Sequence, residues 1–242
     1  MPKRVDEGAA IVTALKRLAE THLSWGFGLL YRRLRLEGYV WGRKRVYAHY
    51  KRLGLHLRRA IKPKRLRPVC SDKIVATAPN QGWSLDFLSD RVVAGGQARI
   101  LNVMDDYSRK CLWVRAKSTY KAGSLVSDLR HLIGMYGKPT YIRCDNGPEL
   151  TSGEMARFCA EQGITLKFIQ AGKPTQNALV ERLNGTLRKE CLNLHLFGTI
   201  SALQQSLDAW WNVYNFERPH SSLKGKTPQM VYEKNKISIF DW

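Results

Sequence analysis

Three acidic residues occupy positions from which they could bind metal ions. Asp86 lies in the strand-like run 83–87, Asp145 directly precedes the turn at Asn146-Gly147-Pro148, and Glu181 lies on the polar side of a predicted helix. Phosphoryl transfer uses two divalent cations about 3.5–4 Å apart, which need several carboxylate oxygens and stabilise both the attacking and the leaving oxygen. Three converging acids would meet that need.

Each acid also has an ordinary structural interpretation. Asp86 could be a strand-edge residue, Asp145 a turn former and Glu181 half of a surface ion pair on a helix. However, period-two alternation points Asp86 away from Leu85 and Phe87, and a charge in the middle of a strand is costly unless something binds it. The three acids together therefore favour a metal site.

The elements around these acids predict a mixed α/β sheet, because short strand-like runs come first and then alternate with helical ones. The first three strands are expected to form an antiparallel meander, and Asp145 is expected at the carboxyl edge of the sheet. The expected strands are 83–87, 99–104, 111–115, 140–143 and 165–169, and the expected helices are 122–136, 153–162, 177–191 and 201–215.

The helix predicted at 177–191 is amphipathic. Its apolar stripe consists of Leu179, Val180, Leu183 and Leu187, and its polar positions are Asn177, Glu181, Asn184 and Arg188. Arg188 follows Glu181 by seven residues, or about 10.5 Å along a helix, which is too far for direct pairing. We interpret Arg188 as a phosphate contact, with Lys173 and Lys189 nearby, although a solvated arginine is the alternative.

The net charge of +20 favours a polyanionic partner, with nucleic acid as the leading candidate. The excess is concentrated in residues 1–70, which hold 18 basic and 4 acidic side chains, against 22 and 16 in residues 71–242. A solvated basic surface is the alternative interpretation.

The amino-terminal part predicts three helices, at 9–20, 29–37 and 43–53, with a glycine-containing turn before the third, as in a helix-turn-helix unit. The third helix carries the predicted DNA contacts Arg43, Lys44, Arg45, Lys51 and Arg52. A basic helical hairpin that only packs against the next domain is the alternative. We expect a DNA-binding module at 1–57, a basic linker at 58–78, a catalytic domain at 79–236 and a tail at 237–242.

Cysteine usage and hydropathy point to an intracellular protein. The five cysteines form no C-x-x-C pair, so neither a disulfide framework nor a zinc site is indicated. No run approaches the roughly 18 apolar residues of a membrane span, and the charged amino terminus is unlike a signal peptide. We therefore expect a soluble cytosolic protein without a membrane partner.

The spacing of the acids and the short sequence motifs around them resemble those of a known family. Thirty-five residues separate Asp145 from Glu181, as in the DD(35)E pattern of retroviral integrases and insertion-sequence transposases. The sequence is similar to the second-reading-frame (OrfB) transposases over essentially its whole length, including 28–59 and Lys226-Thr227-Pro228. The motifs that show this resemblance are WSLDF at 83–87, DNGPE at 145–149, QNALVERLNG at 176–185 and RPHSSL at 218–223.

The resemblance implies a ribonuclease-H-like catalytic domain in which Asp86, Asp145 and Glu181 bind two Mg²⁺ or Mn²⁺ ions. It also implies cleavage at element ends and attack by the freed 3′-hydroxyl on target DNA, without a covalent protein–DNA intermediate. By the same analogy we expect a homo-oligomer on DNA, in the bacterial cytosol at the nucleoid, and an upstream-frame protein as partner or fusion. The DNA contacts expected in the catalytic domain are Arg188, Lys173, Lys189, Asn177 and Asn184.

Some positions depart from the family, and two other functions remain open. Family members often have Tyr or Phe at the position of Leu179 and Ser at that of Arg182, so contacts near the glutamate are expected to differ. The acids alone would also suit a metal-dependent nuclease that does not join DNA, and a domesticated DNA-binding protein is a further possibility. We expect His220 to have a structural or DNA-contact role, because bound metal already lowers the pKa of water.

Overall fold

A computed structural model describes residues 7–57, 75–170 and 174–237, and it divides into two compact units. Unit 1 comprises residues 1–67 together with the segment 217–226, and unit 2 comprises 68–216 and 227–242. The predicted domain limits 1–57 and 79–236 stay predictions. The segment 217–226 was predicted to belong to the catalytic domain, but it groups with unit 1. Most of the linker predicted at 58–78 lies outside the described residues.

The α-helices in the described residues of unit 1 are α1 (Glu7–Thr21), α2 (Phe27–Leu36) and α3 (Arg43–Arg52). They form because apolar residues recur at helical spacing on each, and glycines at 26 and 42 allow the chain to enter α2 and α3. The core of the unit is made of Ile11, Leu15, Leu18, Leu30, Leu34, Val46 and Tyr50. The three predicted helices thus agree with the structure to within a few residues at their ends.

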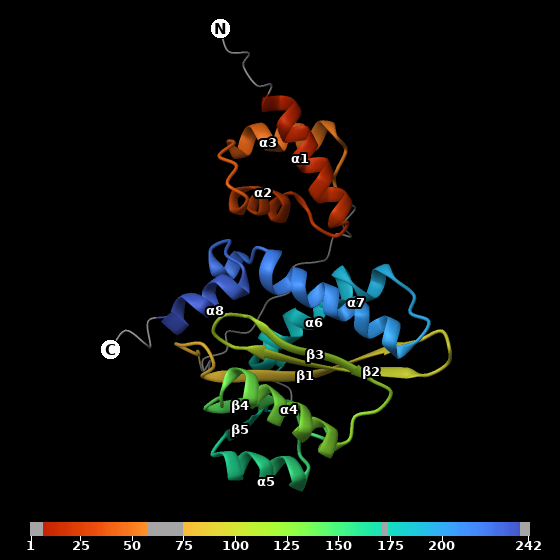
Figure 1. Cartoon of the computed structure of the whole chain (residues 1–242), viewed down its shortest axis with the longest axis vertical. Coiled ribbons are helices and arrows are strands. Elements are labelled where there is room, and N and C mark those ends of the chain that lie inside the picture. Colours follow the sequence, from red (N-terminus) through yellow and green to blue (C-terminus); the bar gives the residue numbers. More distant parts are fainter. Residues whose placement is uncertain (1–6, 58–74, 171–173, 238–242) are drawn as a thin grey trace. The chain divides into compact units, whose positions relative to one another are not determined.

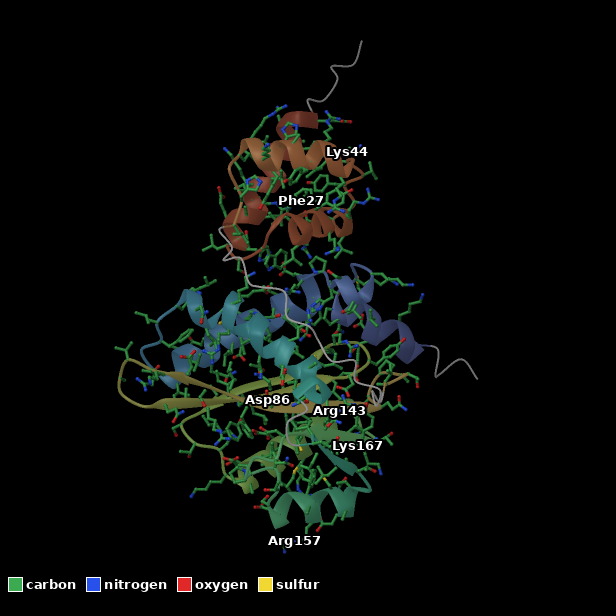
Figure 2. The ribbon with its side chains drawn as sticks, turned by 180° about the vertical axis from the view of Figure 1, so that it is seen from behind. Phe27, Lys44, Asp86, Arg143, Arg157 and Lys167 are labelled. Carbon is green, nitrogen blue, oxygen red and sulfur yellow. The ribbon has the colours of Figure 1, made fainter. Side chains whose placement is uncertain are left out.

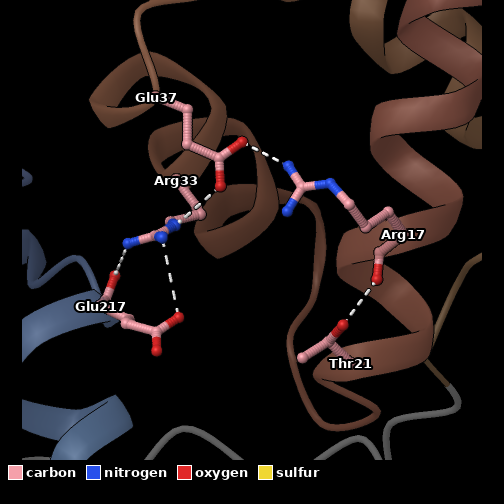
Figure 3. A network of polar contacts seen from close by, with 5 residues as sticks. All are labelled: Arg17, Thr21, Arg33, Glu37 and Glu217. Carbon is pink, nitrogen blue, oxygen red and sulfur yellow. Dashed lines mark hydrogen bonds and ion pairs between the residues drawn. The ribbon is translucent and has the colours of Figure 1, made fainter.

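An ion-pair network links the elements of unit 1 (Figure 3). Glu37, just after α2, accepts from Arg17 of α1 and, at 3.0 Å, from Nε of Arg33. Arg33 also donates to the backbone carbonyl of Glu217 at 3.2 Å, and its Nη2 lies 3.6 Å from the Glu217 carboxylate. Arg32 donates to the Ser221 hydroxyl at 2.8 Å. The segment 217–226 is therefore bonded to two neighbouring arginines of α2.

Unit 2 is built on a five-stranded mixed sheet in the order β3-β2-β1-β4-β5 (Figure 1). β1 pairs antiparallel with β2 and β2 with β3, which confirms the predicted meander, whereas β1–β4 and β4–β5 are parallel. The strands are β1 (Gly82–Arg91), β2 (Gln97–Asp105), β3 (Cys111–Lys117), β4 (Tyr141–Cys144) and β5 (Thr165–Phe168). The hairpin from β1 to β2 turns at Gly95 and Gly96, both at positive φ, which glycine adopts without strain.

Helices cover both faces of this sheet (Figure 1). One face packs against α4 (Ala122–Tyr136) and α5 (Gly153–Gln162), and its buried residues include Leu85, Leu101, Val103, Leu129, Ile142 and Phe158. The other packs against α6 (Ala178–Glu190) and α7 (Ile200–Asn212), and its buried residues include Ile100, Met104, Val114, Leu183, Leu187 and Leu203. The mixed α/β layers confirm the predicted fold class.

The carboxyl-terminal helix α8 (Pro228–Ile237) is an element that the apolar periodicity did not predict. A local signal for it exists, because the Thr227 hydroxyl accepts from the Met230 backbone N–H at 3.3 Å and Pro228 occupies the first helical position. Short helical turns lie at Pro174–Asn177, Leu192–Leu194, Val213–Glu217 and Ser221–Leu223. No helix in the described part of the chain is both long and apolar enough to cross a lipid bilayer.

Candidate active site

Asp86 lies in the middle of β1 and points to the face of the sheet that α6 covers (Figure 2). Its neighbours Leu85 and Phe87 both pack into the core on the opposite face, as the alternation predicts. One carboxylate oxygen, Oδ1, accepts from the Phe87 backbone N–H at 2.9 Å, and Oδ2 accepts from the Asn184 amide at 2.7 Å. The carboxylate is only partly exposed.

Asp145 follows the last residue of β4, at the predicted carboxyl edge of the sheet. Ser84 of β1 pairs with Arg143 of β4 in parallel register, and Asp86 and Asp145 each lie two residues further along. Continued by two residues beyond the paired stretch, this register would bring the two acids level with each other. The Asp145 side chain accepts from the Gly147 backbone N–H at 3.0 Å, which closes the predicted turn.

Glu181 lies in the first turn of α6, with an exposed side chain. The buried residues Val180, Leu183 and Leu187 fix the orientation of the helix against the sheet. The apolar stripe predicted for this helix is therefore confirmed at these three positions.

Electrostatics connects the three acids. Burial, with a smaller contribution from the negative charges of Asp145 and Glu181, raises the pKa of Asp86 to about 6, against the hydrogen bonds from Phe87 and Asn184 that lower it. Both carboxylates are thus near enough to disfavour ionisation of Asp86. Within the described ranges, no three His, Cys, Asp or Glu side chains are close enough together to enclose a metal ion in this arrangement.

The donor set nevertheless suits a hard divalent cation. Three carboxylates with mutually unfavourable charges offer the oxygen ligands that Mg²⁺ and Mn²⁺ prefer, and a cation between them would relieve the repulsion that raises the pKa of Asp86. Glu181 is exposed, so packing does not confine its side chain to one rotamer.

Two of the predicted DNA contacts are instead buried amides. The exposed fractions of Asn177 and Asn184 are 2% and 8%. Asn177 donates to the Leu85 carbonyl at 3.3 Å, and Asn184 bonds to Asp86 and Asn102. Their burial and these hydrogen bonds leave little of either side chain open to DNA, and the contact with DNA stays a prediction. Helical periodicity placed them on the polar side of α6, but the buried sector of this helix is wide enough to include them.

The remaining predicted DNA contacts of unit 2 lie at the end of α6 or outside the described residues. Arg188 is exposed and donates to the Ser89 carbonyl at 3.1 Å, and Lys189 is exposed beside it. Lys173 lies outside the described residues. The His220 side chain, in the segment 217–226 of unit 1, is only 9% exposed, which agrees with a structural role.

All five predicted contacts on α3, namely Arg43, Lys44, Arg45, Lys51 and Arg52, are exposed (Figure 2 labels Lys44). They are not equivalent, because Arg45 forms an ion pair with Glu7, and the Arg43 guanidinium lies 5.8 Å from the Phe27 ring centroid. Tyr47, on the same helix, is 44% exposed. The helix therefore presents basic and aromatic side chains together.

Three residues near the site were missed by the sequence analysis. Asn102 lies opposite Asp86 on β2, and Arg99 forms an ion pair with Glu149, four residues after Asp145. Asn102 and Arg99 are polar residues in the otherwise apolar run 99–104, and this contrast could have marked them as residues with a role near the site. Glu149 belonged to a recognised motif, but no role was assigned to it.

The comparisons with known proteins agree with this architecture. Two models described as "Integrase core domain" match residues 76–174 and 162–228. A 31.7 kDa protein of insertion element IS407 from Burkholderia multivorans is 33% identical, and the match covers 96% of this chain and 84% of that protein. The transposase of insertion sequence IS904 from Lactococcus lactis is 29% identical over 79% of this chain and 74% of its own length.

A solved structure shows the same fold. A chain of the simian T-cell lymphotropic virus intasome, in complex with the PP2A regulatory subunit B56 gamma, aligns over 83% of this chain and 74% of its own, with a TM-score of 0.57 and 21% identity. Fold and family matches define a polynucleotidyl transferase with a ribonuclease-H-like, integrase-type core. The chain belongs to the insertion-sequence transposases with this core, and its function is DNA transposition.

Proposed function

We propose that this transposase cuts DNA at the ends of its element and joins the freed 3′-hydroxyl to target DNA, with divalent metal ions held by Asp86, Asp145 and Glu181. The proposal is supported by the positions of these acids, in the middle of β1, directly after β4 and in the first turn of α6, the helix that packs on the same face of the sheet. Mg²⁺ or Mn²⁺ bound there, with two ions expected, would activate the attacking oxygen and stabilise the leaving one.

The chain itself contributes binding and orientation. In each step an oxygen of water or of a 3′-hydroxyl attacks phosphorus, a new P–O bond forms, and the bond to the leaving 3′ oxygen breaks. The paired stretch of β1 and β4 leads directly to Asp86 and Asp145, and the buried stripe of α6 fixes the helix that carries Glu181, which supports a shared site. Such fixed positions reduce the reorganisation needed during the reaction.

DNA binding is assigned to two basic surfaces. Exposed Arg43, Lys44, Lys51 and Arg52 on α3 suit the phosphates and groove of a duplex, as in a helix-turn-helix unit. Arg188 and Lys189 at the end of α6 suit phosphates near the acids, and Lys173 remains in the proposal by its sequence position alone. Action on two element ends implies a homo-oligomer on DNA, in the bacterial cytosol at the nucleoid. An upstream-frame protein is proposed as a partner or fusion.

The test is a strand-transfer assay with labelled element-end DNA and Mg²⁺ or Mn²⁺. Glu181→Gln removes a ligand charge while preserving size, so joining and cleavage should both be lost. The matched control is Glu154→Gln, because Glu154 is also exposed in the first turn of a helix, here α5, and should leave the reaction unchanged. Cleavage without joining would favour the nuclease, and DNA binding with neither reaction would favour a regulatory DNA-binding protein.

A further inference from the structure

Asn102 is a fully buried polar residue in the middle of an apolar strand. It pairs directly with Asp86 across β1 and β2, and its sequence neighbours Leu101 and Val103 are also fully buried. Cross-strand partners point to the same face of a sheet, so the Asn102 side chain lies beside the Asp86 carboxylate. A buried amide is costly unless hydrogen bonds compensate for its loss of hydration.

Two hydrogen bonds run from Asn102 to Asp86 through α6. The Asn102 Nδ2 donates to Oδ1 of Asn184 at 2.6 Å, and the Asn184 Nδ2 donates to Oδ2 of Asp86 at 2.7 Å. Asn184 lies three residues after Glu181, about one helical turn along. The chain of amides therefore joins β2, α6 and β1 beside the candidate metal site.

The negative charge of Asp86 determines which group donates and which accepts in these two hydrogen bonds. An ionised carboxylate can only accept, so Asn184 must turn its NH₂ group toward Asp86 and its carbonyl toward Asn102. Asn102 must then donate, which leaves its own Oδ1 buried without a hydrogen-bond partner in the described structure. An acceptor left in this state lowers stability, so Asn102 is a poor choice for packing alone.

We propose that Asn102 and Asn184 form a directional amide relay that orients the Asp86 carboxylate for metal binding. Both are positioning residues, since they act through Asp86, and the inference rests on the metal centre proposed above. Asn102 supplies the donor that prevents the Asn184 amide from turning over. Residues that orient metal ligands typically contribute roughly 10- to 100-fold to metal affinity.

The test has two measurements on the full chain without DNA. Calorimetric titration with Mn²⁺ gives the metal affinity, and thermal unfolding gives the stability. Asn102→Leu replaces the amide with an apolar side chain of similar volume, removing both the donor and the unsatisfied acceptor. We expect Mn²⁺ affinity to fall about tenfold while the metal-free melting temperature stays the same or rises. A residue with only a structural role would not lower affinity while preserving stability.

Asn184→Leu provides a second route if Asn102→Leu does not fold, and the double variant tests whether the two amides act as a unit. The relay predicts that the double variant binds Mn²⁺ no more weakly than Asn184→Leu alone. The matched control is Asn215→Leu, because Asn215 is equally buried and makes two 2.9 Å hydrogen bonds to the backbone of Cys111. This variant should melt earlier and bind Mn²⁺ with unchanged affinity.

Two outcomes overturn the relay separately from the metal centre. If Asp86→Asn abolishes Mn²⁺ binding but both leucine variants bind like wild type, or their losses add in the double variant, the relay is wrong and the metal centre stands. If wild type binds Mn²⁺ no tighter than Asp86→Asn, the proposed metal centre fails and the relay fails with it.

Discussion

Arg99 and Glu149 form a bidentate ion pair that connects β2 to the loop after Asp145. The Nη1–Oε1 distance is 2.6 Å and the Nη2–Oε2 distance is 3.1 Å, and the Arg99 guanidinium also lies 4.5 Å from the Phe87 ring centroid. The Glu149 side chain is only 12% exposed, so the pair is partly shielded from water. The guanidinium is held by Glu149 through two hydrogen bonds and by the Phe87 ring, so the ion pair limits the movement of the loop that carries Asp145.

Replacing Arg99 by lysine tests this restriction. Arg99→Lys keeps the charge but loses the two-pronged geometry, and the expected cost is about 1 kcal/mol of unfolding free energy. Because a small displacement of Asp145 affects in-line attack, we expect strand transfer to slow by roughly tenfold or more. Arg130→Lys is the control, since its pair with Glu161 is long, at 3.6 Å, and more than half exposed on both sides. Equal effects of the two substitutions would contradict the special role of Arg99.

The raised pKa of Asp86 predicts how stability changes with pH. The pKa of Asp86 in the folded protein is about 6, above the 3.8 of a carboxyl in the unfolded chain, so the ionised carboxylate costs stability above pH 6, and this cost vanishes as the pH falls below about 4. In metal-free buffer, Asp86→Asn should therefore melt at a higher temperature than wild type at pH 7.5. The difference should shrink as the pH is lowered from 6 to 4. Thermal unfolding across this range checks the sign, and a pH-independent difference would argue against it.

Proton competition also predicts weaker metal binding in acid. Metal ions bind the ionised carboxylate, so Mn²⁺ affinity should fall as the pH drops below about 6, where Asp86 takes up a proton. Calorimetric titrations at pH 7.5 and pH 5 measure this change. Affinity that stays constant between these values would exclude Asp86 as a ligand with this pKa.

Neutralising α3 should weaken DNA binding by removing phosphate contacts. Lys44→Ala and Lys51→Ala are each expected to reduce affinity for element-end duplex and to lower the slope of log K against log salt by about one. Both lysines are exposed and lie on α3. Lys16→Ala on α1 is the control, because Lys16 is exposed but lies on another helix. Salt-dependent fluorescence anisotropy measures the slopes. Unchanged slopes in both α3 variants would remove this helix from the interface.

Gly82 at the start of β1 leaves room for an aromatic ring. A Cβ at this position would overlap the Tyr141 side chain, whose hydroxyl donates to the buried Asp106 carboxylate at 2.9 Å. Gly82→Ala should therefore displace Tyr141 and cost about 2–3 kcal/mol by overpacking and a lost hydrogen bond. Gly134→Ala in α4, where a Cβ has open space, should instead stabilise the helix by up to about 1 kcal/mol. Denaturant unfolding compares the two, and similar values would contradict the close packing at Gly82.

Local patterns in the sequence predicted the elements that carry the acids, but not the contacts that orient them. Period-two alternation around Asp86 and the apolar stripe before and after Glu181 depend only on neighbouring residues, and both were confirmed. The bonds of Asn184 depend on which residue of β2 pairs with Asp86, and this register follows from the packing of the whole sheet. The Arg99–Glu149 pair joins residues fifty positions apart, which no periodicity reveals.

The segment 217–226 makes the fold of unit 1 discontinuous in sequence. Arg32 and Arg33 meet their partners Ser221 and Glu217 only after more than 180 further residues have been synthesised, since the two pairs are 189 and 184 residues apart in sequence. During translation, the amino-terminal helices therefore leave the ribosome first but gain their full set of contacts last. A gene fragment ending in the linker would encode α1 to α3 without these bonds, so the complete unit can be produced only from a reading frame that continues through residue 226.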